Sequence, residues 1–440
     1  MLGKAESERM LVQKPWDHAI ELKESFVPRK GKVYSLSRDE REEVQVFVED
    51  QLRKGYIWPS KSPQMSPVHF VAKKDGKRRI VQDYQHINEG TIKNVYPLPL
   101  ISDILDVVGM KKVFTKLDLH WGYNNVRIKE GNKWKAVFTT HIGSYELTVM
   151  YFSLTNSPAT FQTMMNNLFR DMVNQGSTAT FIDDIIIATD MEERHDEIVE
   201  EVLWRLEEND LFVKPEKCRW KVREVEFLGV VIRPGGVRIQ KEKVGGVLSW
   251  LTPRSAKDIQ KFMGLTNYYR RFIQDFSKVA KPLNMLVGKD RKWEWRTEQQ
   301  GAFKELKRRF TMEPVLAVPD RDQEMRVEAD ASDYATEGML SVKGVDRKWR
   351  PVAFISKLLS PPERNYEIHD KEMLVVIQCL EDWRHYLEGT KKEFGIWTDH
   401  KNLQYFMSSQ KLNHRQARWA LYLSRFNFVL NMYLEKVWAK

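Results

Sequence analysis

The sequence has little cysteine and no long apolar run. Its 440 residues include only two cysteines, Cys218 and Cys379, which excludes a disulfide framework and a cysteine-rich zinc module. The apolar runs are far shorter than the roughly 18 residues of a membrane span, and the charged N-terminus has no apolar segment typical of a secretory signal. The glycine-rich signatures of P-loop hydrolases and of dinucleotide-binding enzymes are also absent. We therefore expect an intracellular protein with no membrane partner, and neither a small-molecule NTPase nor a dehydrogenase.

The composition is that of a globular, basic protein. Hydrophobic residues make up 42% of the chain and aromatic residues 11%, and 71 basic against 61 acidic side chains give a net charge of +10. Residues 254–310 carry 15 basic and 6 acidic side chains, so this segment alone holds a net +9. Within it, Tyr268 to Phe272 interleave aromatic and basic residues. The segment is either a clamp on a nucleic-acid backbone or a solvated helical face.

Apolar periodicity and turn signals predict a mixed α and β chain. A helix should begin after Ser37, which with Glu40 forms a capping box, and end before Gly55. A second capping box at Ser255 and Asp258 predicts another helix. Further helices are expected at 158–173, 192–209 and 371–387, and strands or hairpins at 68–81, 113–119, 178–189, 227–239, 325–328, 338–342, 351–354 and 394–398.

Three aspartates in apolar strands could do chemistry. Asp183 and Asp184 are adjacent in the run Phe181 to Ile187, and Asp118 ends the run that begins at Val113. A buried carboxylate without a partner is costly, so these residues need a reason to be there. A turn between two strands is one reason, because aspartate tolerates turns. Binding of Mg²⁺ is the other, and three such carboxylates could hold two ions for phosphoryl transfer.

A second acidic set lies downstream. Asp330 follows a strand, Glu372 is on a helix, and Asp399 follows the strand at 394–398. Each is unremarkable alone, and their spacing does not by itself bring them together.

The chain strongly resembles the reverse transcriptase–ribonuclease H region of the polyprotein of gypsy-type LTR retrotransposons, especially fungal ones. The resemblance runs from Pro15 to about Phe428 and rests on many motifs in order. Among them are Thr115-Lys116-Leu117-Asp118-Leu119, Ile182-Asp183-Asp184-Ile185 and Trp397-Thr398-Asp399-His400. The others lie at 62–63, 73–76, 81–84, 154–162, 227–229, 267–273, 330–332 and 371–374.

The resemblance implies an α+β right-hand polymerase of fingers, palm and thumb, followed by an α/β ribonuclease H-like domain. We expect an N-terminal leader at 1–35, fingers and palm at 36–250, a basic thumb and connection at 251–320, and the ribonuclease H-like domain at 321–440.

The resemblance also implies roles for individual residues. Asp118, Asp183 and Asp184 would be the catalytic carboxylates of the palm, with the Leu119 carbonyl as a further metal ligand. The incoming nucleotide would meet Lys73 and Arg79 at its phosphates, Tyr123 as a steric gate against ribose, and Phe152. Nucleic acid would be held by Phe227, Leu228 and Gly229 as primer grip and by Tyr268, Arg270 and Arg271. Asp330, Glu372 and Asp399 would be metal ligands of the ribonuclease H site. Each site would take two Mg²⁺ ions, with Mn²⁺ as the alternative.

The chain departs from the family pattern at several positions. Phe181 stands where tyrosine is usual, Ser153 and Glu337 where glycine is usual, and His414 where arginine is usual. No aspartate follows Asp399, so a fourth ribonuclease H carboxylate is missing, and we expect the ribonuclease H activity to be impaired and the domain to be C-terminally truncated.

The implied function is that of an RNA-directed DNA polymerase whose ribonuclease H domain degrades the RNA of RNA–DNA hybrids. The partners would be an RNA template, a DNA primer, the hybrid and dNTPs, and the chain would be a monomer or a homodimer. It would act in cytoplasmic virus-like particles, with nuclear entry as an option. The alternative is a decayed or domesticated copy that binds hybrid without catalysis.

Overall fold

The structure is a computed structural model that describes residues 12–72, 76, 78–288, 291–312, 314–320, 322–398 and 412–432. Two predicted site residues, Lys73 and Asp399, lie outside the described residues. Contacts within the chain divide it into two compact units, Met1–Val225 and Glu226–Lys440. The predicted boundary at 250 therefore falls inside the second unit. None of the helices among the described residues is long and apolar enough to cross a membrane.

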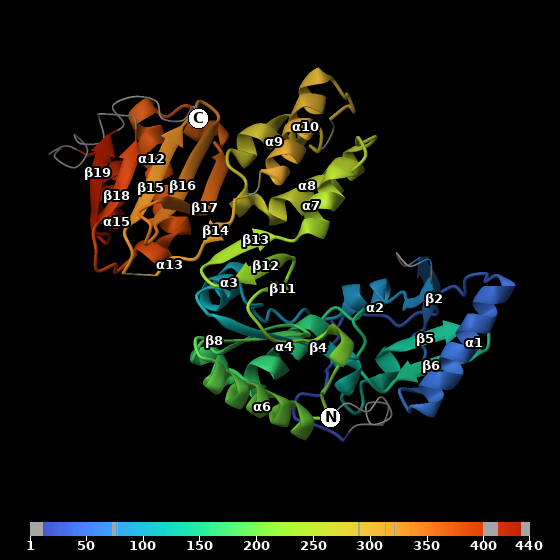
Figure 1. The fold of residues 1–440 in the computed structure, drawn as a ribbon. Helices are drawn as coiled ribbons and strands as arrows, with labels where there is room; N and C mark the ends of the chain where they lie inside the picture. The colour runs from blue at the N-terminus through green and yellow to red at the C-terminus, as the bar shows by residue number, and fades with distance from the viewer. Residues whose placement is uncertain are drawn as a thin grey trace. The chain divides into compact units, whose positions relative to one another are not determined.

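The first unit contains two five-stranded sheets with helices packed on them (Figure 1). Its helices are α1 (Arg38–Arg53), α2 (Gln85–Gly90), α3 (Ile101–Gly109), α4 (Ser157–Leu168), α5 (Arg170–Asn174) and α6 (Glu192–Glu208). Its strands are β1 (Ile57–Pro59), β2 (Ser66–Ala72), β3 (Arg78–Gln82), β4 (Val113–His120), β5 (Val137–Thr140), β6 (Gly143–Leu147), β7 (Thr178–Phe181), β8 (Asp184–Thr189), β9 (Phe212–Val213) and β10 (Arg219–Val222). Short 3₁₀ turns lie at η2 (Gly122–Asn125), η3 (Lys133–Lys135) and η4 (Pro215–Lys217).

One sheet of this unit has the order β1-β6-β5-β2-β3, and the other has the order β10-β4-β8-β7, with β9 added to β4. The second sheet buries one face. Leu117 of β4 and Ile185 and Ile187 of β8 pack in one cluster with Phe161 of α4 and Leu206 of α6. Because side chains alternate along a strand, Lys116, Asp118 and Asp184 lie on the opposite face.

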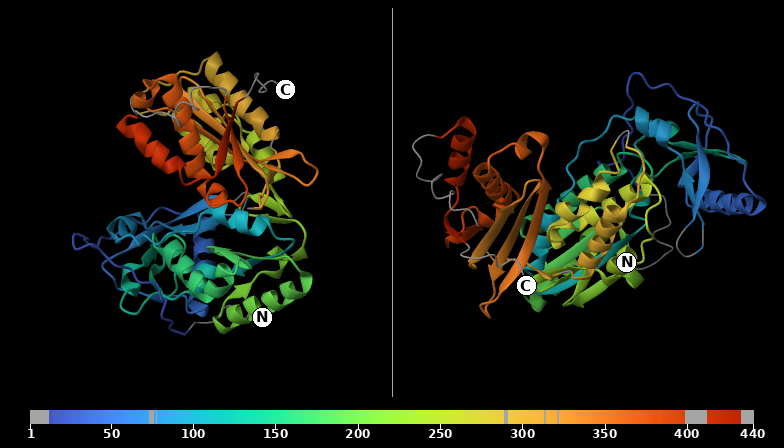
Figure 2. Two further views of the ribbon diagram at one scale, coloured as in Figure 1. Left: turned by 90° about the vertical axis from the view of Figure 1, so that its left-hand side faces the viewer. Right: turned by 90° about the horizontal axis from the view of Figure 1, so that it is seen from above.

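The second unit contains a small sheet, a group of helices and a larger sheet (Figures 1 and 2). Its strands are β11 (Val225–Phe227, which begins at the boundary), β12 (Val230–Arg233), β13 (Gly236–Ile239), β14 (Leu316–Ala317), β15 (Met325–Ala331), β16 (Ala335–Lys343), β17 (Trp349–Leu358), β18 (Phe394–Thr398) and β19 (Phe428–Met432). Its helices are α7 (Lys241–Leu248), α8 (Ala256–Tyr268), α9 (Phe276–Asn284), α10 (Thr297–Thr311), α11 (Pro361–Arg364), α12 (Ile368–Asp382), α13 (Arg384–Leu387) and α15 (His414–Leu423), with a 3₁₀ turn η5 (Arg270–Phe272).

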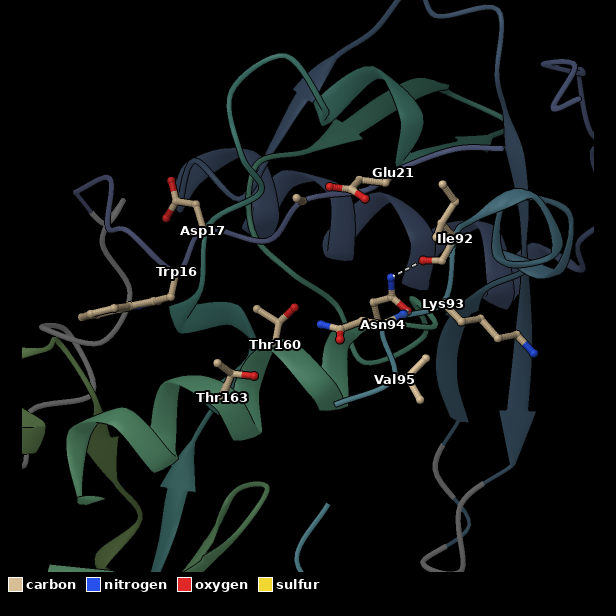
Figure 3. A pocket seen from close by; sticks show the side chains of 11 residues that line it. Trp16, Asp17, Glu21, Ile92, Lys93, Asn94, Val95, Thr160 and Thr163 are labelled. Carbon is tan, nitrogen blue, oxygen red and sulfur yellow. Dashed lines mark hydrogen bonds between the residues drawn. The ribbon is translucent and has the colours of Figure 1, made fainter. Parts of the chain in front are cut away.

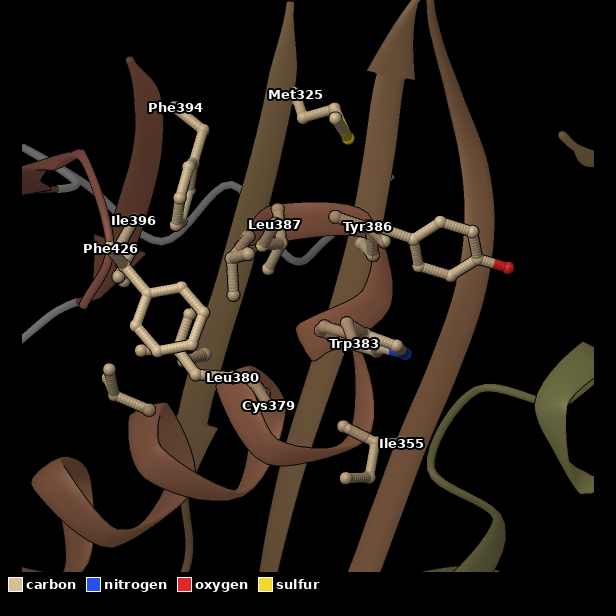
Figure 4. Packing of buried hydrophobic residues seen from close by; sticks show 14 of the residues in the cluster. Met325, Ile355, Cys379, Leu380, Trp383, Tyr386, Leu387, Phe394, Ile396 and Phe426 are labelled. Carbon is tan, nitrogen blue, oxygen red and sulfur yellow. The ribbon is translucent and has the colours of Figure 1, made fainter. Parts of the chain in front are cut away.

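The larger sheet has the order β17-β16-β15-β18-β19 and packs against α12. Strands β15 and β18 are parallel, so their carboxyl ends lie at the same edge. Figure 4 shows Leu380, Trp383 and Leu387, from α12 and the residues after it, among the buried side chains of this core. The core also includes Cys379, which is fully buried and has a free thiol.

Several predicted elements are confirmed. Ser37 and Glu40 form the capping box of α1, and the Ser255 side chain caps α8 by accepting the Asp258 N–H. The predicted hairpins are β2–β3, β7–β8 and β12–β13.

Two predicted helices were too long. The helix expected at 158–173 is divided into α4 and α5, because Phe169 leaves the helical conformation with φ of −118°. The helix expected at 371–387 is divided in the same way at Trp383, with φ of −106°. Both residues are buried, so packing of a large ring overrides the apolar periodicity on which the predictions depended.

Candidate active sites

The three aspartates of the first unit come together at one end of the β4–β8 pair. These strands are antiparallel, and Asp118 lies directly opposite Asp184. Directly opposite residues place their side chains on the same face. Asp183 precedes β8, in the two-residue turn that joins it to β7. Strand pairing thus assembles the set that the sequence left as two separate motifs.

The turn that carries Asp183 is strained. Ile182 has φ of 56°, a left-handed conformation that a β-branched residue rarely adopts. Its backbone N–H donates to Gln162 Oε1 at 2.7 Å, and Gln162 Nε2 donates to the Thr180 carbonyl at 3.2 Å and to its Oγ1 at 3.1 Å. Gln162 is completely buried in α4. One glutamine therefore ties the turn to the helix behind it.

The segment after β4 closes against the same turn. A Cβ atom on Gly122 would lie 3.0 Å from Phe161 Cζ and 3.6 Å from Asp183 Cβ, so the chain has no room for a larger residue here. The ring of the next residue, Tyr123, packs on Phe161 with centroids 5.2 Å apart. Burial, with a smaller effect from the Asp183 carboxylate, raises the pKa of the Tyr123 hydroxyl to about 12. Tyr123 is thus a neutral, fixed ring beside Asp183.

Lysines surround the carboxylates. Lys116 Nζ lies 3.0 Å from Asp184 Oδ1, and the Asp118 carboxylate has Lys214 Nζ at 3.7 Å and Lys217 Nζ at 3.6 Å. Burial is the largest cause that raises the pKa of Asp183, and the Asp184 and Asp118 carboxylates raise it further. The site therefore combines crowded carboxylates with cations that offset part of their charge.

The donor set fits a divalent cation in part. Carboxylate oxygens are hard ligands that suit Mg²⁺ or Mn²⁺, and the repulsion felt by Asp183 is what a bound cation would relieve. In the part of the chain that the structure describes, however, no group of three or more His, Cys, Asp or Glu side chains is spaced to hold a metal. Lys116 pairs with Asp184, and Lys214 and Lys217 lie at ion-pair distance from Asp118, so a cation bound here would compete with these lysines.

The predicted nucleotide contacts are placed as follows. Arg79 is exposed on β3, opposite Val71 of β2. Phe152 is 57% exposed. Leu119 is buried, and its backbone N–H donates to the Asp183 carbonyl at 3.4 Å. These roles remain predictions, as does that of Lys73, which the structure does not describe.

The predicted primer grip is a turn in the second unit. Leu228 and Gly229 both have positive φ, of 47° and 83°. The Tyr268 hydroxyl donates to the Leu228 carbonyl at 2.7 Å, and the Tyr269 hydroxyl donates to the Gly229 carbonyl at 3.1 Å. Phe227 is completely buried. The structure therefore brings Tyr268 to the grip and buries Phe227, while Leu228 and Gly229 are partly exposed.

The two predicted arginines lie beyond α8. Arg270 Nη2 donates to the Ser356 carbonyl of β17 at 2.5 Å, in a contact that also includes Ser277. Arg270 thus joins the basic helical segment to the larger sheet. Arg271 is in the same 3₁₀ turn. Their contact with nucleic acid remains a prediction.

The second acidic set assembles around the ends of β15 and β18. Asp330 is near the end of β15, and Thr398 is the last residue of the parallel strand β18. Glu372 of α12 is 2% exposed and accepts a hydrogen bond from Thr398 Oγ1 at 3.3 Å. Asp399 follows Thr398 in the sequence but lies outside the described residues. Two of the three predicted ligands are therefore placed near one edge of the sheet.

Glu337 lies directly opposite Asp330 on β16. Burial raises its pKa to about 8, and the Asp275 carboxyl group adds to the effect. This upward shift opposes ionisation of Glu337, so the residue that replaces the usual glycine adds less negative charge beside Asp330 than a free carboxylate would.

A pocket of the first unit is separate from these residues. It has a volume of about 420 Å³ and lies among the N-terminal segment, residues 92–95 and α4 (Figure 3). Asp17 and Glu21 line it together with Lys93, and Asn156 bridges two walls by donating to the Ile92 carbonyl and accepting the Asn94 N–H. The pocket contains none of the predicted catalytic residues.

Sequence reasoning gave no role to Lys116, Gln162, Lys214, Lys217 or Tyr269. Lys116 could have been found, because a residue two before Asp118 on a strand shares its face. The other contacts join segments that are distant in the chain, and no local pattern signals them.

Two family matches agree with this geometry. Residues 71–232 match the reverse transcriptase (RNA-dependent DNA polymerase) family, and residues 320–426 match the RNase H-like domain found in reverse transcriptases. The first contains both strands that carry the aspartates, and the second contains Asp330 and Glu372.

Curated relatives are transposon polyproteins. The Tf2-3 and Tf2-7 polyproteins of Schizosaccharomyces pombe are each 37% identical over 382 residues, which is 86% of this chain and 29% of the relative. The chain thus spans less than a third of the length of these relatives.

Solved structures share the fold at 22% identity. A foamy viral protease-reverse transcriptase in complex with dsDNA has a TM-score of 0.79, over 96% of this chain and 88% of that one. A foamy viral protease-reverse transcriptase in complex with an RNA/DNA hybrid has a TM-score of 0.76, over 96% of this chain and 57% of that one. The fold is the predicted one, a polymerase followed by a ribonuclease H-like domain. The chain belongs to the reverse transcriptase family, as the reverse transcriptase and ribonuclease H-like region of a gypsy-type LTR retrotransposon polyprotein.

Proposed function

We propose that the chain is an RNA-directed DNA polymerase that extends a DNA primer on a retrotransposon RNA template. The observation that carries the proposal is the pairing of Asp118 with Asp184 across β4 and β8, with Asp183 held in the strained turn between β7 and β8. Two motifs that are more than sixty residues apart meet here as one carboxylate set, inside the segment that matches the polymerase family.

In this proposal the carboxylates hold two divalent ions, Mg²⁺ or the alternative Mn²⁺. Bound ions would activate the attacking oxygen and stabilise the leaving oxygen of an in-line displacement. The chain's own residues do the positioning. Gln162 fixes the turn that presents Asp183, and the Tyr123 ring fills the space beside Asp183, where it would exclude a ribose 2′-hydroxyl. Arg79 and Phe152 are exposed and available to an incoming dNTP.

Primer extension tests the proposal. We expect wild-type protein with Mg²⁺ to extend a DNA primer on poly(rA), and Asp183→Asn to lose extension while it still binds the hybrid. Asp39→Asn, at an exposed aspartate in the first turn of α1, should extend like wild type. Hybrid binding without extension by the wild type would instead support the alternative of a copy that binds without catalysis.

The ribonuclease H-like domain is proposed to cut the RNA strand of RNA–DNA hybrids through Asp330, Glu372 and Asp399. The contact of buried Glu372 with Thr398 supports this, because it brings the helix to the strand end that precedes Asp399. Glu372→Gln should abolish cleavage of labelled RNA in a hybrid and leave primer extension intact. Glu381→Gln, at an exposed position of the same helix, should change neither activity.

The division into fingers and palm at 36–250, thumb and connection at 251–320, and ribonuclease H at 321–440 is part of the proposal. So are the partners (RNA template, DNA primer and dNTPs) and the location in cytoplasmic virus-like particles. Co-sedimentation of the chain with particle RNA in a cell fractionation would test the location.

A further inference from the structure

Two adjacent arginines of β3 belong to opposite faces of the β2–β3 hairpin. Arg78 lies opposite Ala72 in the ladder, and Arg79 lies opposite Val71. Side chains alternate along a strand, and directly opposite residues share a face, so each arginine is on a different face. Arg79 and Val71 are both exposed. The face that carries Arg79 is therefore open to solvent.

The face that carries Arg78 packs against α1. Its pair of Phe70 and Ile80 contacts the core cluster that includes Val44 of this helix. The next pair toward the tip of the hairpin is Ala72 and Arg78. Ala72 is exposed, and its side chain is too small to extend the core. The apolar packing therefore ends one pair before the two strands do.

Arg78 continues the attachment to α1 through charge. Its Nη2 donates to Glu43 Oε1 at 2.8 Å, and its Nη1 lies 3.7 Å from Glu40 Oε1. Its guanidinium also lies over the Phe70 ring, 5.6 Å from the ring centroid. Glu40 is itself restrained, because its Oε2 accepts the Ser37 N–H in the capping box of α1. A single exposed ion pair contributes little, but a network with restrained partners contributes more.

We propose that Arg78 is a positioning residue whose ion pairs with Glu43 and Glu40 hold the end of the hairpin on α1. This attachment keeps Arg79 on the open face, in place for the phosphates of an incoming dNTP. The inference rests on the proposed polymerase function and on the phosphate contact expected of Arg79. Arg78 itself does not touch the nucleotide. A hairpin released from α1 would present Arg79 in many positions, so nucleotide affinity would fall through lost pre-organisation.

The test measures dTTP binding without chemistry. The full chain is mixed with Mg²⁺, poly(rA) and an oligo(dT) primer that ends in a dideoxynucleotide, so that dTTP can bind but cannot react. The dissociation constant of dTTP is obtained from the concentration that stabilises the protein–hybrid complex against a competitor hybrid. The affinity for the hybrid alone is measured on the same preparations.

The variants separate the ion pair from the nucleotide contact. They are Arg78→Met, Glu43→Ala, the double variant of these two, and the charge swap Arg78→Glu with Glu43→Arg. Arg79→Met is made alone and together with Arg78→Met. Arg38→Met is the matched control, because Arg38 pairs with Glu42 at 3.2 Å on the same helix, and this ion pair joins α1 only to itself.

Arg78→Met should weaken dTTP binding by about threefold to fivefold, the scale of a network of exposed ion pairs. Glu43→Ala should also weaken it, and the double variant should be no weaker than Arg78→Met, because both changes remove the same ion pair. The charge swap should recover most of the loss. Arg79→Met should weaken binding by about tenfold or more, and adding Arg78→Met should then cause little further loss. Arg38→Met should bind dTTP like the wild type, and hybrid affinity should be the same in all proteins.

The inference is overturned if Arg78→Met behaves like Arg38→Met, or if Glu43→Ala binds dTTP like the wild type. It is equally overturned if Arg78→Met causes the same loss with and without Arg79, because Arg78 would then act on the nucleotide directly. Failure of the proposed function looks different. If the wild type binds no dTTP on the hybrid, the inference falls with the function. If it binds dTTP with the predicted variant pattern but does not extend an unblocked primer, the inference stands without the polymerase.

Discussion

The side-chain carbonyl of Gln162 accepts the backbone N–H of Ile182 at 2.7 Å. Ile182 is in the left-handed region with φ of 56°, and the next residue is Asp183. The same glutamine donates to Thr180 on β7, so it holds the strand and the turn together. The catalytic geometry proposed here therefore depends on a residue of α4 that does not itself face the nucleotide.

Replacing Gln162 by leucine should weaken both the fold and the polymerase. The change keeps the bulk but leaves a buried N–H without an acceptor, which costs about 1–3 kcal/mol. Urea denaturation should show this loss, and kcat for primer extension should fall more than KM changes, because the turn presents Asp183 rather than substrate. Gln175→Leu, at an exposed position after α5, is the control. Equal kcat for Gln162→Leu and wild type would show that the turn needs no such support.

Two glycines make a matched pair. Gly122→Ala would place a methyl group 3.0 Å from Phe161 Cζ and next to Asp183, so we expect a lower extension rate and a lower melting temperature. Gly264→Ala adds a methyl group in open space within α8. Alanine is the better helix former, by about 1 kcal/mol, so this variant should melt at the same temperature or higher. The reverse order of melting temperatures would contradict the close packing around Gly122.

Tyr123 should select deoxyribonucleotides through its ring. Tyr123→Val opens the space beside Asp183, and the ratio of kcat/KM for rNTP to that for dNTP should rise. Tyr123→Phe keeps the ring, which packs on Phe161, and should keep the ratio of the wild type. Single-nucleotide incorporation with each nucleotide measures both. A raised ratio in the phenylalanine variant would assign the selectivity to the hydroxyl instead.

His18 should make the first unit sensitive to acid. Its ring is buried, with Nδ1 2.9 Å from Thr160 Oγ1, and burial lowers its pKa from 6.5 to about 4. Below pH 6.5 the His18 ring binds a proton in the unfolded chain but not in the folded chain. The free energy of unfolding therefore falls as the pH drops toward 4. The loss is about 3 kcal/mol for a shift of this size.

Urea denaturation between pH 7 and pH 4.5 checks this expectation. His18→Gln should reduce the dependence of stability on pH, whereas His141→Gln, at an exposed histidine, should leave it unchanged. An identical pH dependence in wild type and His18→Gln would contradict a buried neutral histidine.

The sequence predicted most elements of the fold because their signals are local. The capping box at Ser37, the helix cap at Ser255 and the apolar stretches of β4 and β8 are visible without a structure. The Asp258 carboxylate does not complete a box at Ser255, because it accepts the Arg254 N–H instead. The carboxylate set was predicted as residues but not as geometry. Only the register, which puts Asp118 opposite Asp184, makes the two motifs one site.

What the sequence could not predict depends on distant segments or on packing. The helix ends at Phe169 and Trp383 interrupt periodic patterns because large rings pack there, and periodicity does not report this. The approach of Lys214 and Lys217 to Asp118 requires the return of the chain along β9. The hydrogen bonds of Tyr268 and Tyr269 to Leu228 and Gly229 span 40 residues of sequence.

The central claim is that Asp118, Asp183 and Asp184 form a working polymerase site. The most direct measurement is incorporation of one dNTP on a preformed RNA–DNA primer-template with Mg²⁺, with hybrid binding measured on the same samples. The account predicts rapid incorporation by the wild type, none by Asp183→Asn, and equal hybrid binding by both. Hybrid binding by both proteins with no incorporation by either would contradict the claim and leave a fold that binds nucleic acid without polymerising it.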